Sequence, residues 1–232
     1  MAYRIIRLVI SEKFGDTVNT VYPTLLWDEK NIVLVDCGFI GSLSTLEKEL
    51  AQYGLTVKQL TVLVLTHHDH DHMGTAAALK RANPELKIYS SQAEAAYISA
   101  QEKPLRLKQA EELQKTLPLE QQDFGRAFCD MLRRVEPVIV DEFLYDNDKM
   151  DWCGGCRIIA TPGHTPGHIS LFMEKGSIVI TGDAIALEKG CPVIANPQFT
   201  LDLNQAESSM NKLLSLQANT YYCYHGGVYE KK

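Results

Sequence analysis

Short apolar runs rich in β-branched residues alternate with amphipathic stretches along the first hundred residues. The runs end at turn-forming residues, so we predict strands at 3–10, 20–27, 31–36, 61–65 and 87–90. The stretches between them have helical periodicity or are rich in alanine, and they predict helices at 42–54, 74–83 and 91–100. The last helix begins at Ser91 with Glu94 three residues on, the pattern of a capping box. This alternation indicates an α/β layer structure.

Residues 104–135 break this rhythm with two helical patterns separated at Pro118. We interpret them as a helical cap inserted at about 101–136. Their apolar residues recur at helical spacing, which favours core packing or contact in a homodimer, with cover for a hydrophobic substrate as the alternative. Beyond the cap we predict strands at 138–145, 156–162, 168–174, 177–183 and 220–224, and a helix at 203–216. The simplest account is one domain over residues 1–232, with two β-halves and outer helices.

Composition narrows the class of partner. The 232 residues are 45% hydrophobic and 22% charged, which is typical of a globular chain, and the net charge is −6. Excess negative charge disfavours nucleic acids and anionic membranes, so we expect a small-molecule substrate. The six cysteines lack the spacing of a disulfide framework, and neither an export signal nor a membrane-length apolar run is visible. We therefore expect a cytoplasmic protein.

The most unusual stretch is TVLVLTHHDHDHMG at 61–74, in which four histidines and two aspartates follow a buried strand. Imidazole and carboxylate groups are ligands for divalent cations. The other polar candidates also stand where strands or Gly/Pro turns end: His164 and His168, His225, and the aspartates Asp36 and Asp183. We expect these groups to converge at a sheet edge, where open α/β proteins bind ligands.

Together these segments form an ordered pattern: Thr66-His67, then Asp71-His72-Met73-Gly74, Gly163-His164, Gly182-Asp183 and a late His225. The pattern resembles the metallo-β-lactamase fold superfamily over nearly the whole chain. The resemblance implies a four-layer αββα sandwich of two mixed β-sheets with outer helices, and a metal site at the sheet edge. Its closest functional likeness is to glyoxalase II-like thioesterases and lactonases.

The chain departs from the family pattern at one position. Asp71-His72 fixes the register, and Asp69 then stands where the second histidine is expected. The resemblance implies two metal ions, with these ligands: His67, Asp69 and His164 for one, Asp71, His72 and His225 for the other, and Asp183 bridging. Alternatively, Asp69 hydrogen-bonds a ligand histidine without binding metal.

The additional carboxylate affects which metal is expected. An oxygen ligand in place of imidazole makes Mn²⁺ and Fe²⁺ more competitive with Zn²⁺, so zinc, iron and manganese all remain candidates. Such a pair supplies hydroxide at neutral pH, with Asp71 and Asp183 positioned to manage the proton. We expect a hydrolase acting on a small ester, lactone, thioester or phosphoester.

Two other classes stay open. An iron-dependent oxidoreductase of this fold would need a separate electron-transfer partner, because few residues follow His225. A non-catalytic metal-binding module is disfavoured because the full ligand set is present.

The remaining polar residues have weaker assignments. We expect His68 and His70 to be exposed or to lie beside the ligands, since alternate positions point away. His168 contacts substrate, supports a ligand or is structural, and Asp36 orients a ligand histidine. The motif Cys153-Gly-Gly-Cys156 is more simply a hairpin turn than a metal or redox site, because no second Cys or His pair lies near it.

Overall fold

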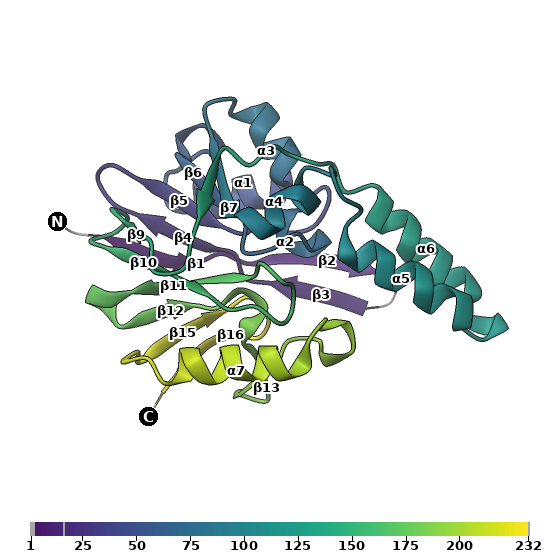
Figure 1. The fold of residues 1–232 in the computed structure, drawn as a ribbon. Coiled ribbons are helices and arrows are strands. Elements are labelled where there is room, and N and C mark those ends of the chain that lie inside the picture. Colours follow the sequence, from purple (N-terminus) through teal and green to yellow (C-terminus); the bar gives the residue numbers. More distant parts are fainter. Residues whose placement is uncertain (1–2, 16, 232) are drawn as a thin grey trace.

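Two six-stranded sheets form the centre of the computed structural model, which describes residues 3–15 and 17–231. They lie face to face, with helices on both outer sides, as the sequence predicts (Figure 1). α1, α3 and α4 lie on the side of the N-terminal sheet, and α7 lies on the side of the C-terminal sheet. This is the four-layer αββα arrangement.

The N-terminal sheet has the order β1-β4-β5-β6-β7-β8. Its first three strands are antiparallel and the rest are parallel. The strand bounds are Arg4–Arg7, Thr24–Trp27, Ile32–Val35, Val62–Val64, Lys87–Ser91 and Glu142–Leu144.

The C-terminal sheet has the order β16-β15-β12-β11-β10-β9. β12 and β15 are parallel, and the other pairs are antiparallel. From β9 to β16 its strands span Lys149–Met150, Cys156–Ala160, Ile169–Met173, Ile178–Ile180, Thr220–Cys223 and Gly227–Glu230.

Seven α-helices, two small hairpins and several short 3₁₀ helices complete the described chain. The helices α1 to α7 span Leu43–Ala51, His70–Met73, Ala76–Ala82, Gln92–Ile98, Leu105–Thr116, Gln122–Arg133 and Leu203–Leu214. The hairpins are β2–β3, Ile10–Phe14 with Thr17–Val21, and β13–β14, Ala186–Glu188 with Cys191–Val193. None of the helices in the described residues is long and apolar enough to cross a membrane.

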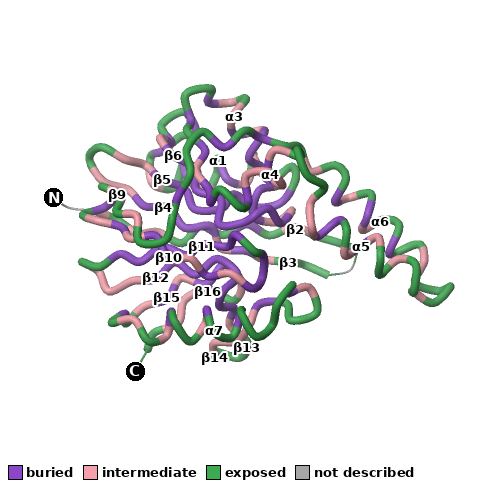
Figure 2. Tube along the Cα trace, in the orientation of Figure 1, coloured by how far each residue is buried: buried purple, intermediate pink, exposed green. Residues whose placement is uncertain are grey.

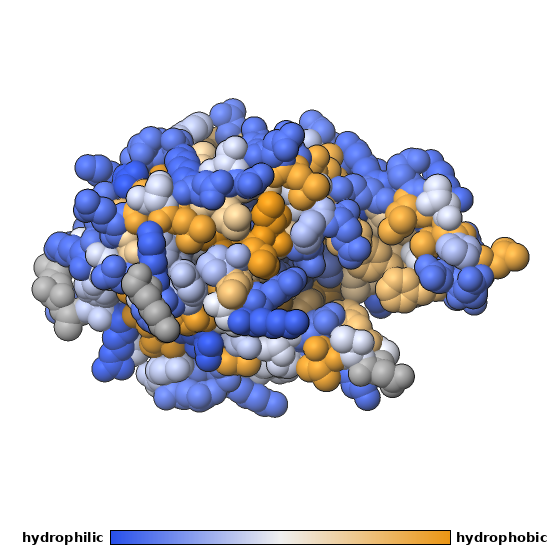
Figure 3. All heavy atoms as spheres, turned by 90° about the horizontal axis from the view of Figure 1, so that it is seen from below, coloured by the Kyte–Doolittle hydropathy of each residue, from blue (hydrophilic) through white to orange (hydrophobic). Residues whose placement is uncertain are grey.

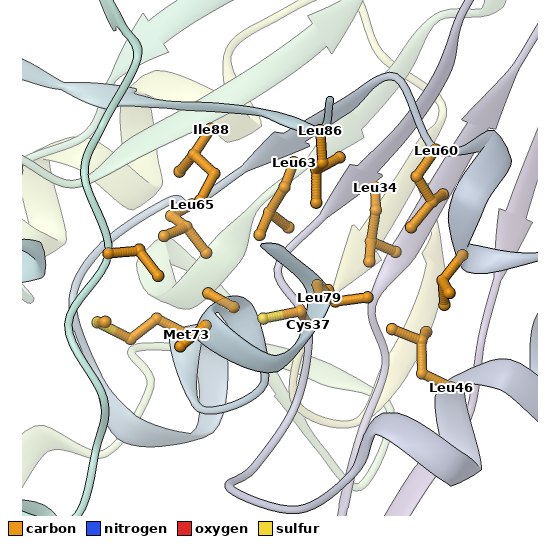
Figure 4. Packing of buried hydrophobic residues seen from close by; sticks show 14 of the residues in the cluster. Leu34, Cys37, Leu46, Leu60, Leu63, Leu65, Met73, Leu79, Leu86 and Ile88 are labelled. Carbon is orange, nitrogen blue, oxygen red and sulfur yellow. The ribbon is translucent and has the colours of Figure 1, made fainter. Parts of the chain in front are cut away.

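Alternate residues of the central strands face different cores. Val62 and Val64 of β6 pack between the sheets, whereas Leu63 faces the helices. Figure 4 shows Leu63 with Leu34 of β5, packed toward Leu46 of α1 and the other labelled side chains. The sheets form the buried centre in Figure 2, while much of the α5–α6 hairpin is exposed or half-buried.

Three predicted strands are wrong in detail. The runs 3–10 and 20–27 each divide near Leu8 and Pro23, where the Leu8 amide donates to the Pro23 carbonyl, and the ribbon then leaves the sheet as hairpin β2–β3. The run 138–145 is a strand only over Glu142–Leu144, although Val138 and Val140 are buried in the core. These two residues are buried without pairing as a strand, so the pattern indicated burial and not a strand.

The Cys153-Gly-Gly-Cys156 segment is the turn between β9 and β10. Its Gly155 amide donates to the Trp152 carbonyl, and Cys153 and Cys156 are free thiols buried between the sheets. Burial raises the pKa of the Cys153 thiol to about 12, so it is protonated at neutral pH.

Candidate metal centre

The ends of several strands at one edge of the sandwich deliver the predicted polar groups. His67 and Asp69 lie just beyond β6, and Asp71 and His72 lie in the short helix α2. The remaining groups, His164, Asp183 and His225, follow β10, β12 and β15. These three strands run in the same direction, so their carboxyl ends meet at one edge.

The seven predicted ligands form two groups around Asp183. The first half-site consists of His67, Asp69 and His164, and the second half-site consists of Asp71, His72 and His225. Asp183 Oδ1 lies 3.2 Å from His72 Nε2 and 3.4 Å from His225 Nε2, in the second half-site. Its Oδ2 lies 3.4 Å from His164 Nε2, in the first. Asp183 therefore turns one oxygen toward each half-site.

The second half-site fits a divalent metal ion. Tetrahedral bonds of about 2.0–2.1 Å place neighbouring ligand atoms about 3.3–3.4 Å apart. The distance from His225 Nε2 to Asp71 Oδ2 is 3.3 Å, which agrees with the two distances to Asp183 Oδ1. The Nε2 atoms of His72 and His225 and Asp183 Oδ1 are buried without hydrogen-bond partners. Such orphaned acceptors are costly unless a cation pairs with them.

Charge also favours cations at this centre. Burial opposes ionisation of Asp183, but His225, His72 and His164 outweigh it and hold the pKa of that carboxyl well below its usual range. Burial also opposes ionisation of Asp69 and Asp71, but Arg106 beside Asp69 and the histidines beside both carboxyls lower their pKa values. Three ionised carboxylates therefore face one buried space.

Asp36, which is buried at the end of β5, contacts His72 directly and His67 through Thr66, as its predicted orienting role requires. Its carboxylate lies 2.8 Å from His72 Nδ1 and accepts hydrogen bonds from the Thr66 amide and hydroxyl. The Thr66 hydroxyl in turn lies 3.0 Å from His67 Nδ1. This network leaves the Nε2 atoms of both histidines free to face the centre.

His168 has a structural role and positions Asp183. Its Nε2 accepts the Asp183 backbone N–H at 2.9 Å, so Nδ1 carries the proton and donates to the Thr161 hydroxyl at 2.8 Å. Burial, with His67 and His164 nearby, holds the pKa of His168 well below its usual range, so the ring is neutral. Gly182 is required beside it, because its φ is +53° and a Cβ there would lie 2.6 Å from His168 Nε2.

His68 is buried rather than exposed, and it connects the cap to the centre. Its Nδ1 bonds the Glu94 carboxylate, and its Nε2 accepts the Leu105 N–H at the start of α5. Glu94 is also buried, and it accepts hydrogen bonds from the Thr165 hydroxyl and the Gly167 amide. The predicted capping box is therefore half right: Ser91 caps Glu94 N–H, but the Glu94 carboxylate joins the two ligand loops.

His70 is half-buried and borders a cavity of about 280 Å³ over the centre. The lining also includes Asp71, Asp183 and Arg106, together with the aromatic rings of Phe39, Phe128 and Phe199. Phe128 belongs to α6, so the cap forms part of the cavity wall.

The sequence analysis missed Arg106, which belongs to the cap helix α5 and points into the first half-site. It is 5% exposed, and its Nε and Nη2 both donate to Asp69 Oδ2. Asp69 Oδ2 also lies 3.1 Å from His164 Nε2. One signal for Arg106 was present: a cation in the first turn of a helix is disfavoured by the helix dipole, so this arginine needed another partner.

Two facing β-sheets with outer helices and a His/Asp cluster at their edge define a class of metal-dependent enzymes. The model of the Metallo-beta-lactamase superfamily matches residues 16–225, and the chain belongs to this superfamily. It is a metallo-hydrolase with metal-binding His/Asp clusters typical of the superfamily's dinuclear sites.

Relatives agree with this assignment. The chain is 30% identical to a probable metallo-hydrolase, YflN, of Bacillus subtilis (strain 168), over 90% of this chain and 80% of the relative. It is 28% identical to the hydroxyacylglutathione hydrolase GloC of Haemophilus influenzae, over 70% of this chain and 65% of that protein. A metallo-beta-lactamase family protein from Thermus thermophilus has the same fold, with a TM-score of 0.75 and 24% identity, covering 97% of this chain and 74% of that one.

Proposed function

We propose that this protein hydrolyses a small carboxylic ester, lactone or thioester at its metal centre. The observation that carries the proposal is the convergence of seven His and Asp side chains from distant segments, with buried ligand atoms that lack hydrogen-bond partners. A divalent ion bound there would lower the pKa of water and polarise a carbonyl group.

The residues around the ion would divide the remaining work. Asp183 reaches both half-sites with separate oxygens, so it would hold the centre together as substrate binds. Asp71 borders the cavity and belongs to the second half-site, where its carboxylate would accept a proton from the attacking water. His168 and Asp36 would keep the ligands aligned from behind.

The cavity supports a small substrate with an apolar part. Phe39, Phe128 and Phe199 supply apolar wall, while the reacting end faces the carboxylates and Arg106. The likeness to a hydroxyacylglutathione hydrolase supports a thioester among the candidates. A phosphoester remains an outcome of the test.

The test is a panel of chromogenic lactone, ester, thioester, phosphodiester and β-lactam substrates, assayed with Mn²⁺, Fe²⁺ or Zn²⁺. We expect metal-dependent turnover of at least one acyl substrate, falling by roughly 100-fold or more in Asp183→Ala because the ligand shared by both half-sites is lost. Asp151→Ala is the matched control, since that side chain is 91% exposed, and it should keep full activity.

Two results would overturn the proposal. One is turnover that survives in Asp183→Ala. The other is the absence of turnover with every substrate and metal, together with reversible redox spectra of bound iron. That result would support an oxidoreductase with a separate electron-transfer partner.

A further inference from the structure

The first half-site already contains a cation that belongs to the chain itself. Arg106 Nε and Nη2 donate to Asp69 Oδ2, and Nη2 also lies 3.1 Å from His164 Nε2. The arginine side chain is 6% exposed. Two of the three ligands of this half-site are therefore engaged by one guanidinium group.

This position of the guanidinium is firmly held. Arg106 Nη1 donates to the Phe199 carbonyl at 2.7 Å and to Gln109 Oε1 at 2.8 Å. The guanidinium carbon lies 4.8 Å from the centre of the Phe199 ring, within the range of a cation–π contact. The first turn of α5 is fixed by the hydrogen bond from Leu105 N–H to His68 Nε2.

Arg106 and a metal ion compete for the same atom of His164. His164 Nε2 lies 3.1 Å from both Arg106 Nη2 and Asp69 Oδ2. A guanidinium has only donors, so a hydrogen bond from Arg106 uses the Nε2 lone pair that a metal ion would need. A neutral imidazole nitrogen has one lone pair, and it cannot serve a donor and a metal ion together. In the second half-site both histidines, His72 and His225, present an Nε2 without a hydrogen-bond partner, whereas in the first half-site only His67 does.

The charges agree with this division. Asp69, Asp71 and Asp183 contribute three negative charges, and Arg106 returns one positive charge. A single divalent ion then neutralises the centre. Arg106 thus also compensates the additional carboxylate that Asp69 brings to the family pattern, which weakens the expectation of a shift toward iron or manganese.

We propose that Arg106 and a metal ion are alternative occupants of the first half-site, and that the arginine holds it at metal concentrations that fill the second. The chain would then carry one tightly bound ion, and a second would enter only after α5 withdraws its arginine. This inference rests on the metal centre of the proposed function but not on the hydrolysis itself.

The experiment is equilibrium dialysis of metal-free protein against Mn²⁺ alone, with metal analysis and electron paramagnetic resonance. We expect wild type to bind one equivalent tightly and a second at least about tenfold more weakly, and to show the signal of isolated Mn²⁺ after the first. In Arg106→Gln the second equivalent should tighten by about tenfold or more, and the signal of a coupled pair should appear.

Two further variants locate the second ion. The double variant Arg106→Gln/Asp69→Asn should return to one tight equivalent, because the first half-site loses its carboxylate. Arg81→Gln removes an exposed arginine paired with Glu136 and should behave as wild type. Thermal melting of the metal-free variants checks that each one folds.

Equal affinity of the wild type for two equivalents of Mn²⁺ would overturn the proposal. So would an unchanged affinity for the second equivalent in folded Arg106→Gln. These results are independent of turnover. A protein that binds one ion but cleaves nothing would refute the proposed function and leave the role of Arg106 standing.

Discussion

Asp36 lies behind the ligand histidines and shows how a residue that need not bind metal can control the centre. It accepts hydrogen bonds from Thr66 while its Oδ2 faces His72 Nδ1. An acceptor oxygen in this position fixes which ring nitrogen of His72 carries the proton and leaves Nε2 facing the centre.

We predict that Asp36→Asn weakens Mn²⁺ binding at the second half-site by roughly 10–100-fold, because the amide no longer fixes the His72 tautomer and orientation. Equilibrium dialysis measures the change. Asp141→Asn is the control, since that carboxylate accepts the Ile88 amide at the opposite end of the parallel strands. Unchanged Mn²⁺ affinity in Asp36→Asn would show that His72 is not a ligand oriented in this way.

The sequence analysis found the polar residues that follow strand ends. It missed the roles of Arg106 and Glu94, which depend on contacts with distant segments. His67, Asp71 and His72 stand in one short motif, so their proximity follows from the local chain. Arg106 meets Asp69 across 37 positions, and only the packing of the cap on the sandwich brings them together. The sequence analysis interpreted Glu94 as part of a helix cap, because the sequence does not show that its carboxylate turns toward Thr165.

At the scale of elements, α4 connects the loops that carry the two ligand groups. The buried Glu94 carboxylate accepts from His68 N–H in the first loop and from the Thr165 hydroxyl and Gly167 N–H in the second. Burial opposes ionisation of Glu94, but His68 beside it and the hydrogen bonds that the carboxylate accepts outweigh burial and lower its pKa. All of its partners need an acceptor.

We predict that Glu94→Gln lowers the free energy of unfolding by about 3 kcal/mol, because the amide places donors against donors in a buried site. Urea denaturation of the metal-free protein measures this loss. Glu102→Gln, at an exposed position beyond the same helix, should change stability by less than about 0.5 kcal/mol. A loss of that small size in Glu94→Gln would contradict the bridging role.

Element boundaries were hardest to predict where tertiary contacts decide them. α2 has four residues, and its turn depends on the Asp69 carbonyl, which accepts from the His72 and Met73 amides. Hairpin β13–β14 and strand β16 belong to segments without clear alternation of apolar and polar residues. The β6 strand and helix α1 were predictable because their patterns are strong.

At the scale of the molecule, the sandwich is a compact base from which the α5–α6 hairpin projects to the right in Figure 1. Within this hairpin, Leu107 and Leu132 pack in a small separate hydrophobic core. In Figure 3 hydrophobic side chains lie among hydrophilic ones on the projecting part, and others lie across the middle of the face. In the same hairpin segment Leu119 is 92% exposed and Phe124 is 75% exposed.

A homodimer that buries these exposed residues remains our prediction. Sedimentation equilibrium should give a dimer for wild type and a monomer for Leu119→Asn/Phe124→Ser, because the substitutions remove the apolar contact. Ile139→Asn changes a residue that is 70% exposed and lies outside the hairpin, so it should leave the dimer intact. A monomeric wild type at all concentrations would refute the prediction.

The most direct test of the account is anomalous diffraction from crystals soaked in Mn²⁺. We predict a strong peak in the second half-site, about 2.0–2.2 Å from ligand atoms of Asp71, His72, His225 and Asp183, with Arg106 still paired with Asp69. A centre without a peak, or with His225 or Asp183 turned away from the ion, would contradict the claim that these distant segments form one metal site.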